Sequence, residues 1–373
     1  MLALCFGTRP QVIKTAVLLP VLRSHWPVMT IDTGQHYDFE LNRLLYDQLQ
    51  VPAPDHFLEV GSAEPADQVA AVLTRTAAVF RRHRPAAVVV IGDTNSTLGC
   101  ALAAKKENLP LVHVEAGLRS NEANLPEEIN RRLVDAMADL LCAPSAASAA
   151  RLESERLSGS VVITGDVAYD VLRRNLELAP APRTATPFAL ATIHRAALTD
   201  DPEALRSVIE ALEQIGMPVL FPIHPRTQLA LEQFGLLGRI PASVSTSAPL
   251  GYLDAIAAVR DASVVVTDSG GLQREAYWLG TPCVTLREET EWGETVDCGA
   301  NTLVPPLEAR ERLAEAVAQQ CRRRGNHAWS KEAYGDGNAA QKVADAIPLP
   351  RSAGTAQTST RAPIAPAPPS HIP

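Results

Sequence analysis

The chain is predicted to be an α/β protein with two doubly wound, Rossmann-like domains, each built on a parallel sheet. Short apolar runs alternate with amphipathic segments of helical length along most of the sequence. Runs that are apolar on both faces are typical of parallel strands covered by helices on both sides. A length of 373 residues allows two cores of ordinary size. The prolines Pro180, Pro182 and Pro187 indicate a junction between the halves, which we place at Leu176–Thr186.

The first half is expected to contain six strands separated by helices. The amphipathic segments Gln68–Arg82 and Asn95–Lys106 show the spacing of helices. We assign residues 1–170 to an N-terminal domain, with strands at Leu2–Phe6, Val28–Thr33, Ala87–Gly92, Leu111–Val114, Leu140–Ala143 and Val161–Thr164.

The second half repeats the alternation, and we assign residues 171–345 to a C-terminal domain. Residues 346–373 are rich in Pro, Ala, Ser and Thr and are expected to form a disordered tail. The expected strands are Phe188–Ile193, Pro218–Ile223, Val264–Thr267 and Cys283–Leu286, and the helices are Pro202–Ile215, Tyr252–Val259 and Leu272–Leu279.

Composition excludes several classes of protein. A formal net charge of −8 argues against non-specific binding of nucleic acid or of an anionic membrane. The six cysteines form no C-x-x-C pair, and we expect them to be reduced thiols and not zinc ligands. The N-terminus resembles no signal peptide, and no apolar run is long enough to span a membrane. We therefore expect a cytoplasmic protein.

The most informative segment follows the strand Val264–Thr267. Ser269, Gly270 and Gly271 stand where this strand turns into a helix, so backbone N–H groups at the helix start are free to bind a phosphate. Glycine has no Cβ, which lets an anion approach the main chain. Glu275, one turn later, is a candidate to accept hydrogen bonds from a ribose. The alternative is a tight turn with a serine cap.

A second candidate anion site follows the first strand. Arg9 and Lys14 stand at the beginning of a helix, after Gly7. The alternative is an ordinary helix start, with Pro10 near its first position and a solvated lysine. Gln35 and His36 follow the second strand, where a lone histidine is more often structural than catalytic.

Three carboxylates are expected at the same edge of the first sheet. Asp93 and Glu115 each follow a strand, and Glu127 lies in the first turn of a helix. Several carboxylates in one pocket raise some of each other's pKa values, which provides acid and base forms together. The alternatives are a helix cap for Asp93, an ion pair of Glu115 with Arg119, and a dipole interaction for Glu127.

The second half offers matching groups. His194 and His224 each end a strand and should face the same cleft. No third ligand stands at a useful spacing, so we reject a metal site. Arg287 and Glu291 follow the strand Cys283–Leu286, together with Trp292, for which packing of a loop is the alternative role.

Taken together, these segments resemble the non-hydrolysing UDP-N-acetylglucosamine 2-epimerase family. The matching pieces occur in family order over about residues 1–345. They are GTRPQVIK, TGQHYD, GDTNSTL, HVEAGLRS, PEEINR, GDVAYD, TIHR, HPRT, TDSGGLQREA, LGTPCVTLR, TEWGE and YGDGNA.

The resemblance implies a glycosyltransferase-B fold whose last helix packs back on the first domain. It also implies a homodimer without cofactor that interconverts UDP-GlcNAc and UDP-ManNAc. The route would be elimination of UDP to a 2-acetamidoglucal, followed by re-addition. The catalytic set implied is Asp93, Glu115, Glu127 and His194, with base and acid undecided between the first two. Substrate binding would fall to Arg9, Lys14, Arg119, His224, Ser269, Gly270, Gly271, Glu275, Arg287 and Glu291, and a regulatory site to Gln35 and His36.

The sequence also departs from the family pattern. Gln11 stands where many members have Glu, Ala197-Leu198 replaces a frequent Glu-Asn, and TEWGE replaces TERPE. Gln11, Tyr277-Trp278 and Glu291-Trp292 resemble members that act on modified substrates such as UDP-2,3-diacetamido-glucuronic acid. The alternatives are therefore a 2-epimerase of such a sugar, a hydrolysing epimerase, a UDP-sugar glycosyltransferase and an inactive UDP-sugar sensor.

Overall fold

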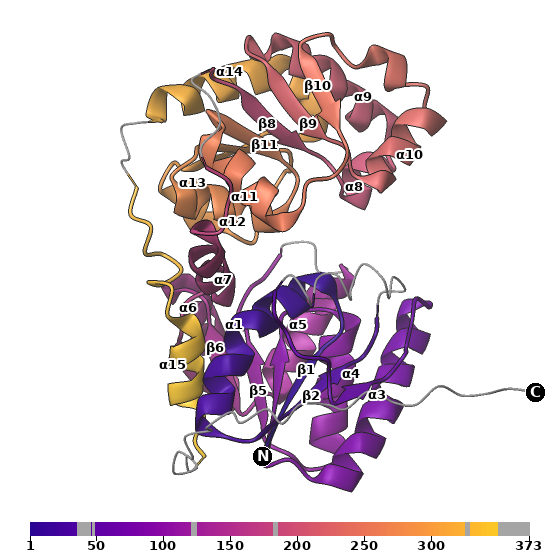
Figure 1. Ribbon diagram of the computed structural model, residues 1–373, viewed down its shortest axis with the longest axis vertical. Coiled ribbons are helices and arrows are strands. Elements are labelled where there is room, and N and C mark those ends of the chain that lie inside the picture. Colours follow the sequence, from indigo (N-terminus) through magenta and orange to yellow (C-terminus); the bar gives the residue numbers. More distant parts are fainter. Residues whose placement is uncertain (36–45, 47–48, 121–124, 182–185, 325–328, 350–373) are drawn as a thin grey trace, which may run out of the picture.

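A computed structural model describes residues 1–35, 46, 49–120, 125–181, 186–324 and 329–349. Two lobes lie one above the other, each with a parallel sheet between layers of helices (Figure 1). The expected α/β class with two doubly wound domains is confirmed. The predicted tail is covered only as far as Leu349, so its expected disorder lies outside the described residues.

The lower lobe contains a seven-stranded sheet of order β3-β2-β1-β4-β5-β6-β7. Every strand pair in it is parallel. Its elements are β1 (Leu2–Phe6), α1 (Arg9–His25), β2 (Val28–Asp32), β3 (His56–Phe57), α3 (Pro65–His83), β4 (Ala87–Ile91), α4 (Asn95–Lys106), β5 (Leu111–Val114), α5 (Pro126–Met137), β6 (Leu140–Ala143), α6 (Ala146–Ser154), β7 (Ser160–Ile163) and α7 (Val167–Leu176).

The upper lobe contains a six-stranded parallel sheet of order β10-β9-β8-β11-β12-β13. Short 3₁₀ turns lie at Leu212–Ile215, Leu237–Arg239 and Pro306–Glu308. The other elements of this lobe are β8 (Ala189–Thr192), α8 (Ala196–Thr199), α9 (Pro202–Ala211), β9 (Val219–Pro222), α10 (Pro225–Gln233), β10 (Val244–Ser247), α11 (Tyr252–Asp261), β11 (Val264–Thr267), α12 (Gly270–Leu279), β12 (Cys283–Thr285), α13 (Gly293–Asp297), β13 (Asn301–Leu303) and α14 (Ala309–Arg323). The last helix, α15 (Ala339–Ala346), belongs to the lower lobe.

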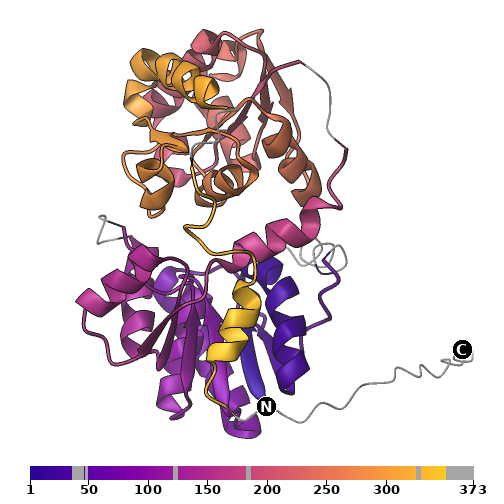
Figure 2. The same ribbon diagram turned by 90° about the vertical axis from the view of Figure 1, so that its left-hand side faces the viewer.

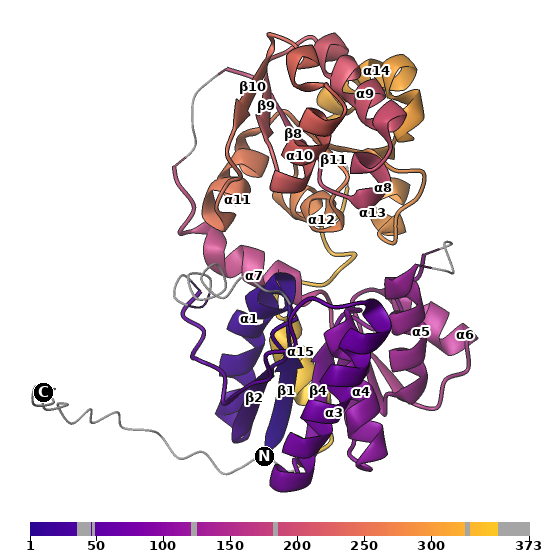
Figure 3. The same cartoon turned by 90° about the vertical axis from the view of Figure 1, so that its right-hand side faces the viewer.

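Alternate residues of each strand pack into different cores, as the pleat of a strand requires. In β1, Leu2, Leu4 and Phe6 pack with α1 and α15, whereas Ala3 and Cys5 pack on the opposite face of the sheet. Figure 3 shows α3 and α4 on that opposite face. This two-sided burial explains why the strands lack polar alternation in the sequence.

The helix α15 returns to the lower lobe after the chain has completed the upper one (Figure 2). Its apolar residues join the core beneath α1, and the Asp170 carboxylate accepts hydrogen bonds from the backbone N–H groups of Ala339 and Ala340, at 2.9 and 2.8 Å. Two glycines let the returning chain pass close to the turn between β7 and α7. A Cβ on Gly165 would lie 2.9 Å from the Tyr334 carbonyl oxygen, and Gly165 and Gly335 both have positive φ.

Three strands were not predicted from the sequence: β3, β10 and β13. Each has two to four residues and lies at an edge of its sheet, and β10 and β13 are polar in sequence. A short edge strand needs little apolar surface, so its composition carries no strong signal.

Candidate functional site

The carboxyl ends of the two sheets meet at a cleft between the lobes, which is where α/β proteins of this kind bind ligands. A cavity of about 690 Å³ lies there. The start of α5 lines it from the lower lobe, with Pro126 and Glu127. The upper lobe contributes residues that follow β8, β11 and β12, among them His194, Asp268 and Arg287.

The start of α12 has the geometry expected of an anion site. The Ser269 hydroxyl caps the helix by accepting a hydrogen bond from the backbone N–H of Leu272 at 3.3 Å. The serine cap is therefore present, while backbone donors remain at the helix start.

The two glycines of this helix start, Gly270 and Gly271, differ in the space that a Cβ atom would find. A Cβ on Gly270 would lie 3.1 Å from Glu291 Oε1, whereas on Gly271 the nearest atom would be 3.8 Å away. Packing explains Gly270, and nothing described packs against Gly271.

Glu275 lies one turn into α12 and contacts the hydroxyl of Tyr252. Burial raises the pKa of Glu275 to about 7, although Arg274 and the Tyr252 hydroxyl lower it. A carboxyl group with such a pKa changes its charge near neutral pH, and groups of this kind are concentrated at functional sites.

His194 is held in place by a buried aspartate. Asp268 Oδ1 lies 3.3 Å from His194 Nδ1, and Asp268 Oδ2 accepts the backbone N–H groups of His194 and Arg195 at 2.9 and 2.8 Å. Asp268 is 1% exposed, and its Oδ1 atom has no hydrogen-bond partner among the described residues. Asp268 therefore fixes the backbone at His194 and places a carboxylate oxygen close to the imidazole. The rings of His194 and His224 lie 5.7 Å apart.

His224 faces positive groups from both lobes. Burial and the neighbouring His194 lower the pKa of His224 below its ordinary value, and Arg226 and Arg9 add to this effect. Arg9 itself is exposed at the beginning of α1. The charge of Arg9 therefore acts on His224 from the lower lobe.

The three carboxylates of the lower sheet are held separately. Asp93 pairs with Arg131 at 2.5 Å, and Glu115 pairs with Lys14 at 2.5 Å. Glu127 is exposed and lines the cavity, which Asp93 and Glu115 do not. The proposed cap by Asp93 is wrong, because Thr94 caps α4.

The expected mutual repulsion of these carboxylates is also not what the structure shows. Burial alone would raise the pKa of Glu115, but Lys14 and Arg274 lower it below its ordinary value. At the same edge of the sheet, burial and the charge of Glu115 raise the pKa of Asp166.

Arg119 lies away from the cavity, in contrast to the expected substrate-binding role and to the alternative pairing with Glu115. Its guanidinium binds Asp135 at 2.7 Å and Glu155 at 2.6 Å. It therefore ties α5 to the end of α6.

Gln35 and His36 are the residues at which a regulatory site was expected. Gln35 Oε1 accepts hydrogen bonds from the backbone N–H and the hydroxyl of Ser96, at 2.9 and 2.6 Å, and His36 lies outside the described residues.

Arg287 and Glu291 form an ion pair of 2.9 Å on the upper side of the cleft. Burial alone would raise the pKa of Glu291, but Arg287, Arg131 and Arg195 lower it to about 2. Arg131 belongs to the lower lobe, so charges of both lobes meet here. Trp292 is buried, with Arg274 stacked 3.8 Å from its ring centroid, which confirms the packing role.

Several residues of this region were missed from the sequence: Asp166, Asp268, Arg131 and Arg274. Asp268 could have been found, because it follows β11 at the same sheet edge as the other candidates. The others lie within helices or loops whose approach to the cleft depends on how the two lobes are arranged.

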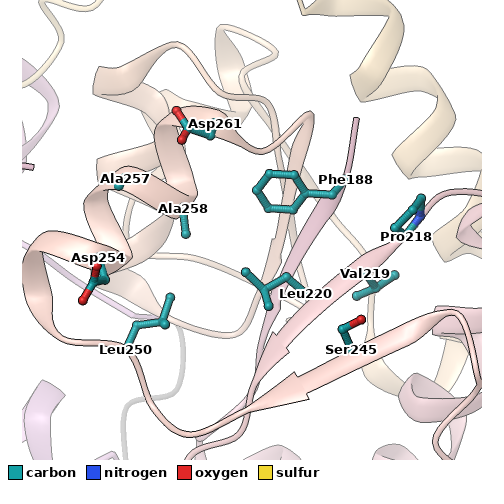
Figure 4. Close-up of a pocket in the computed structure, with 10 residues that line it drawn as sticks. All are labelled: Phe188, Pro218, Val219, Leu220, Ser245, Leu250, Asp254, Ala257, Ala258 and Asp261. Carbon is teal, nitrogen blue, oxygen red and sulfur yellow. The ribbon is translucent and has the colours of Figure 1, made fainter. Parts of the chain in front are cut away.

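A second cavity, of about 430 Å³, lies beside α11 and over β8, β9 and β10 (Figure 4). Its walls are mainly apolar, with Phe188, Leu220 and Leu250 prominent, and its two acidic side chains are Asp254 and Asp261. None of the predicted site residues lines it, so it is no candidate for the chemistry of the cleft.

Within the described ranges, no three His, Cys, Asp or Glu side chains are grouped so that they could hold a metal ion. Across the same parts of the chain, no helix has the length and apolar character needed to cross a membrane.

Two Rossmann-like lobes with a cleft at their sheet edges and a returning C-terminal helix define a protein of glycosyltransferase-B architecture. The fold is shared with MurG from Acinetobacter baumannii, at a TM-score of 0.53 and 14% identity, over 93% of this chain and 98% of MurG. A sequence model described as UDP-N-acetylglucosamine 2-epimerase matches residues 22–348. The chain belongs to this family of nucleotide-sugar 2-epimerases, which are isomerases.

Relatives with two different substrate names are similarly close. The chain is 37% identical over 350 residues to a UDP-2,3-diacetamido-2,3-dideoxy-D-glucuronate 2-epimerase of Pseudomonas aeruginosa, which covers 91% of this chain and 97% of the relative. It is 33% identical over 362 residues to a UDP-N-acetylglucosamine 2-epimerase of Methanocaldococcus jannaschii, covering 92% and 97%. A crystal structure of the latter enzyme with UDP-GlcNAc and UDP superposes with a TM-score of 0.84, at 32% identity and 92% and 98% coverage.

Proposed function

We propose that this protein interconverts UDP-GlcNAc and UDP-ManNAc. The observation that carries the proposal is the cavity between the lobes, where Glu127 faces His194 and its partner Asp268 beside the start of α12. The crystal structure of the M. jannaschii relative contains UDP-GlcNAc and UDP, which supports the same class of ligand here.

In this proposal the nucleotide is bound by the upper lobe. The diphosphate lies at the helix start formed by Ser269, Gly270 and Gly271, where the helix dipole favours an anion. The donors there are the backbone N–H groups of the two glycines, because the N–H of Ser269 already donates to Thr267 Oγ1 at 3.0 Å. Arg9 reaches it from the lower lobe, and Glu275 accepts hydrogen bonds from the ribose. The remaining cations, Lys14 and Arg287, and His224 border the same cleft.

The chemistry begins with cleavage of the bond between C1 and the diphosphate oxygen. The C2 proton is not adjacent to a carbonyl group, so it becomes removable only as positive charge builds at C1. The electrons of the C1–O bond leave with UDP, and those of the C2–H bond form a C1=C2 double bond in a 2-acetamidoglucal. Donors already aimed at the departing diphosphate stabilise its growing charge. Re-addition of UDP with protonation from the other face of C2 gives the epimer.

Asp93 and Glu115 are the proposed pair that removes and returns the proton, in either order. Asp93 forms an ion pair with Arg131, and Glu115 forms one with Lys14. Glu127 and His194 assist as acid–base or orienting groups, and Asp268 places a carboxylate oxygen 3.3 Å from His194 Nδ1.

A second candidate is the 2-epimerisation of UDP-2,3-diacetamido-glucuronic acid. The observation in its favour is the 37% identity to the P. aeruginosa relative, against 33% to the M. jannaschii enzyme. Both candidates use the same proton chemistry at C2 and differ only in the groups at C3 and C6 of the sugar.

The test is to incubate the protein with each UDP-sugar alone and to follow the anomeric and C2 protons by NMR. The proposal predicts a UDP-ManNAc signal from UDP-GlcNAc, with no free sugar beyond slow release. Conversion of the diacetamido-glucuronate substrate alone supports the second candidate. Release of free ManNAc and UDP indicates a hydrolysing enzyme, and no conversion without an acceptor sugar favours a glycosyltransferase or a sensor.

We also propose that the protein is a homodimer, as the family resemblance implies. Light scattering after gel filtration should give twice the mass of one chain. A mass equal to one chain at micromolar concentration contradicts this.

A further inference from the structure

Four buried charged side chains meet where the lobes touch. Lys14, Glu115 and Asp166 belong to the lower lobe, and Arg274 reaches them from α12 of the upper lobe. The Arg274 Nη1 atom bonds Asp166 Oδ2 and lies 3.6 Å from Glu115 Oε1. The side chains of Glu115 and Arg274 are 6% and 9% exposed, so water screens this cluster little.

Glu115 is held so that one carboxylate oxygen stays free. Its backbone has a φ of +69°, which is unusual for a residue other than glycine. The Oε2 atom accepts the hydrogen bond from Lys14, whereas Oε1 is buried with no hydrogen-bond partner among the described residues. A buried acceptor without a donor costs free energy unless it serves another purpose.

Arg274 is fixed from three directions. Its guanidinium binds Asp166, its Nε donates to the Gly270 carbonyl at 3.3 Å, and its plane lies over Trp292 at 3.8 Å from the ring centroid. These contacts hold the cation near Glu115 Oε1 but beyond hydrogen-bond length. The free oxygen therefore feels a positive charge while its lone pairs remain available.

We propose that Arg274 is a positioning residue for Glu115, through which the nucleotide-binding helix of the upper lobe holds the carboxylate of the lower lobe ionised and oriented for proton transfer. The inference rests on the proposed function, in which Glu115 exchanges a proton with the sugar. It assigns to α12 a second role, because the helix that starts at the diphosphate site also carries this cation.

The charges around Glu115 agree with this role. Lys14 and Arg274 both lower the pKa of Glu115 against the effect of burial. Two further titratable groups, Glu275 and Tyr334, lie near Arg274. Both interact with Arg274 and Asp166. Neither is among the main causes of the lowered pKa of Glu115.

The alternative is that Arg274 only joins the lobes. Buried ion pairs are weak evidence of stabilisation, because the loss of hydration offsets much of the attraction. The two roles differ in what the loss of Arg274 changes. A joining role predicts lower stability or weaker UDP binding, whereas a positioning role predicts a slower proton transfer with a shifted pH dependence.

The experiment compares the wild type with Arg274→Gln and Arg274→Lys. In each protein, kcat and KM are measured from pH 5 to 9, and UDP affinity by calorimetry. For Arg274→Gln we expect kcat to fall by about tenfold or more, a usual scale for disturbed acid–base catalysis, while UDP affinity changes less than about threefold. The acidic limb of the kcat profile should move to higher pH, because the cation that favours ionised Glu115 is lost. Arg274→Lys should restore part of both effects.

Two controls keep the test independent of folding. In Arg274→Gln, Asp166 is left buried without its cation, and the double variant Asp166→Asn/Arg274→Gln removes this charge. The double variant should shift the acidic limb in the same direction as Arg274→Gln but less, because the negative charge of Asp166, which raises the pKa of Glu115, is lost as well. Arg260→Gln removes another partly buried arginine of the upper lobe, which pairs with Asp261 beside the second cavity, and should leave the profile unchanged. An unmoved acidic limb in the Arg274→Gln variant overturns the inference, as does a loss confined to UDP affinity.

The failure of the proposed function would be seen separately, as a wild-type protein that converts neither UDP-sugar. The ionisation of Glu115 is then followed directly through the ¹³C shift of its carboxyl group, assigned with Glu115→Gln. A higher pKa of Glu115 in Arg274→Gln than in the wild type supports the inference without turnover, and equal pKa values overturn it.

Discussion

At the scale of single residues, the proposed mechanism depends on two carboxylates, Asp93 and Glu115, each of which forms an ion pair with a cation of the lower lobe. Replacing Asp93 by Asn or Glu115 by Gln preserves shape and removes the charge that accepts a proton. We expect each variant to lose about two decades of kcat, the usual effect of removing a general acid or base. UDP should still bind, since neither Asp93 nor Glu115 is among the residues proposed to contact the diphosphate or the ribose.

The measurement is the steady-state rate with UDP-GlcNAc, with UDP calorimetry and circular dichroism as controls for binding and folding. Near-normal turnover in both variants would remove Asp93 and Glu115 from the mechanism.

Glu275 leads to a prediction about pH. With a pKa of about 7, the group is protonated and neutral below that pH and ionised above it. A carboxylate is the better acceptor for ribose hydroxyls, because a hydrogen bond to a charged group contributes about 1.5–3 kcal/mol. The affinity for UDP should therefore increase as the pH rises from 6 to 8.

Glu275→Gln is the matched control, since it leaves the titration of UDP itself in place. The variant should bind more weakly at pH 8 and should lose the part of the pH dependence that comes from the protein. Identical pH profiles of the dissociation constant for the two proteins would refute the ribose role.

At the scale of elements, the two glycines at the start of α12 are expected to have different roles, one in packing and the other in contact with the ligand. A Cβ at position 270 would press on Glu291 at 3.1 Å, so Gly270→Ala should lower the free energy of unfolding. At position 271 the nearest atom is 3.8 Å away. Gly271→Ala should keep the stability or raise it by up to about 1 kcal/mol, since alanine favours a helix over glycine. It should nevertheless weaken UDP binding, because the added methyl group occupies the path of the phosphate.

Urea denaturation and UDP calorimetry on both variants test this separation. Full UDP affinity in Gly271→Ala would mean that the diphosphate does not lie at this helix start.

The elements also show how far the sequence could be interpreted. The buried strands were predictable because they are apolar on both faces, and the strand ends could be identified because Gly, Asp and His follow them. The partners of the charged groups could not be predicted. Arg119 stands four residues from Glu115 in the chain, yet the left-handed backbone at Glu115 and the turn at Gly117 direct them to different partners.

At the scale of the whole molecule, the returning chain joins the lobes through close backbone contact. A methyl group at Gly165 would meet the Tyr334 carbonyl oxygen at 2.9 Å and would strain a φ of +88°. Gly216 has a comparable φ of +74° and nothing within 4 Å of its missing Cβ. Gly165→Ala should therefore destabilise the protein by about 1–3 kcal/mol more than Gly216→Ala, the usual cost of overpacking.

The comparison of the two alanine variants in urea isolates the crossing, since both carry the same kind of backbone strain. Equal losses of stability would show that the returning chain can pass the turn after β7 without close contact.

The whole-molecule arrangement was also the part least accessible from the sequence. Local patterns predicted two sheets and a cleft, but the contacts of Arg274 with Asp166 and Glu115 require the lobes to be placed against each other. Such contacts join residues more than a hundred positions apart, and no local pattern of residues indicates them.

The central claim is that UDP departs and the C2 proton is exchanged within the cleft. The most direct measurement is to run the reaction in heavy water and to locate deuterium in the recovered UDP-sugars by NMR. The account predicts deuterium at C2 of the epimer formed, with the same label appearing in recovered substrate as the reaction reverses. Epimerisation with protium retained at C2 would contradict it.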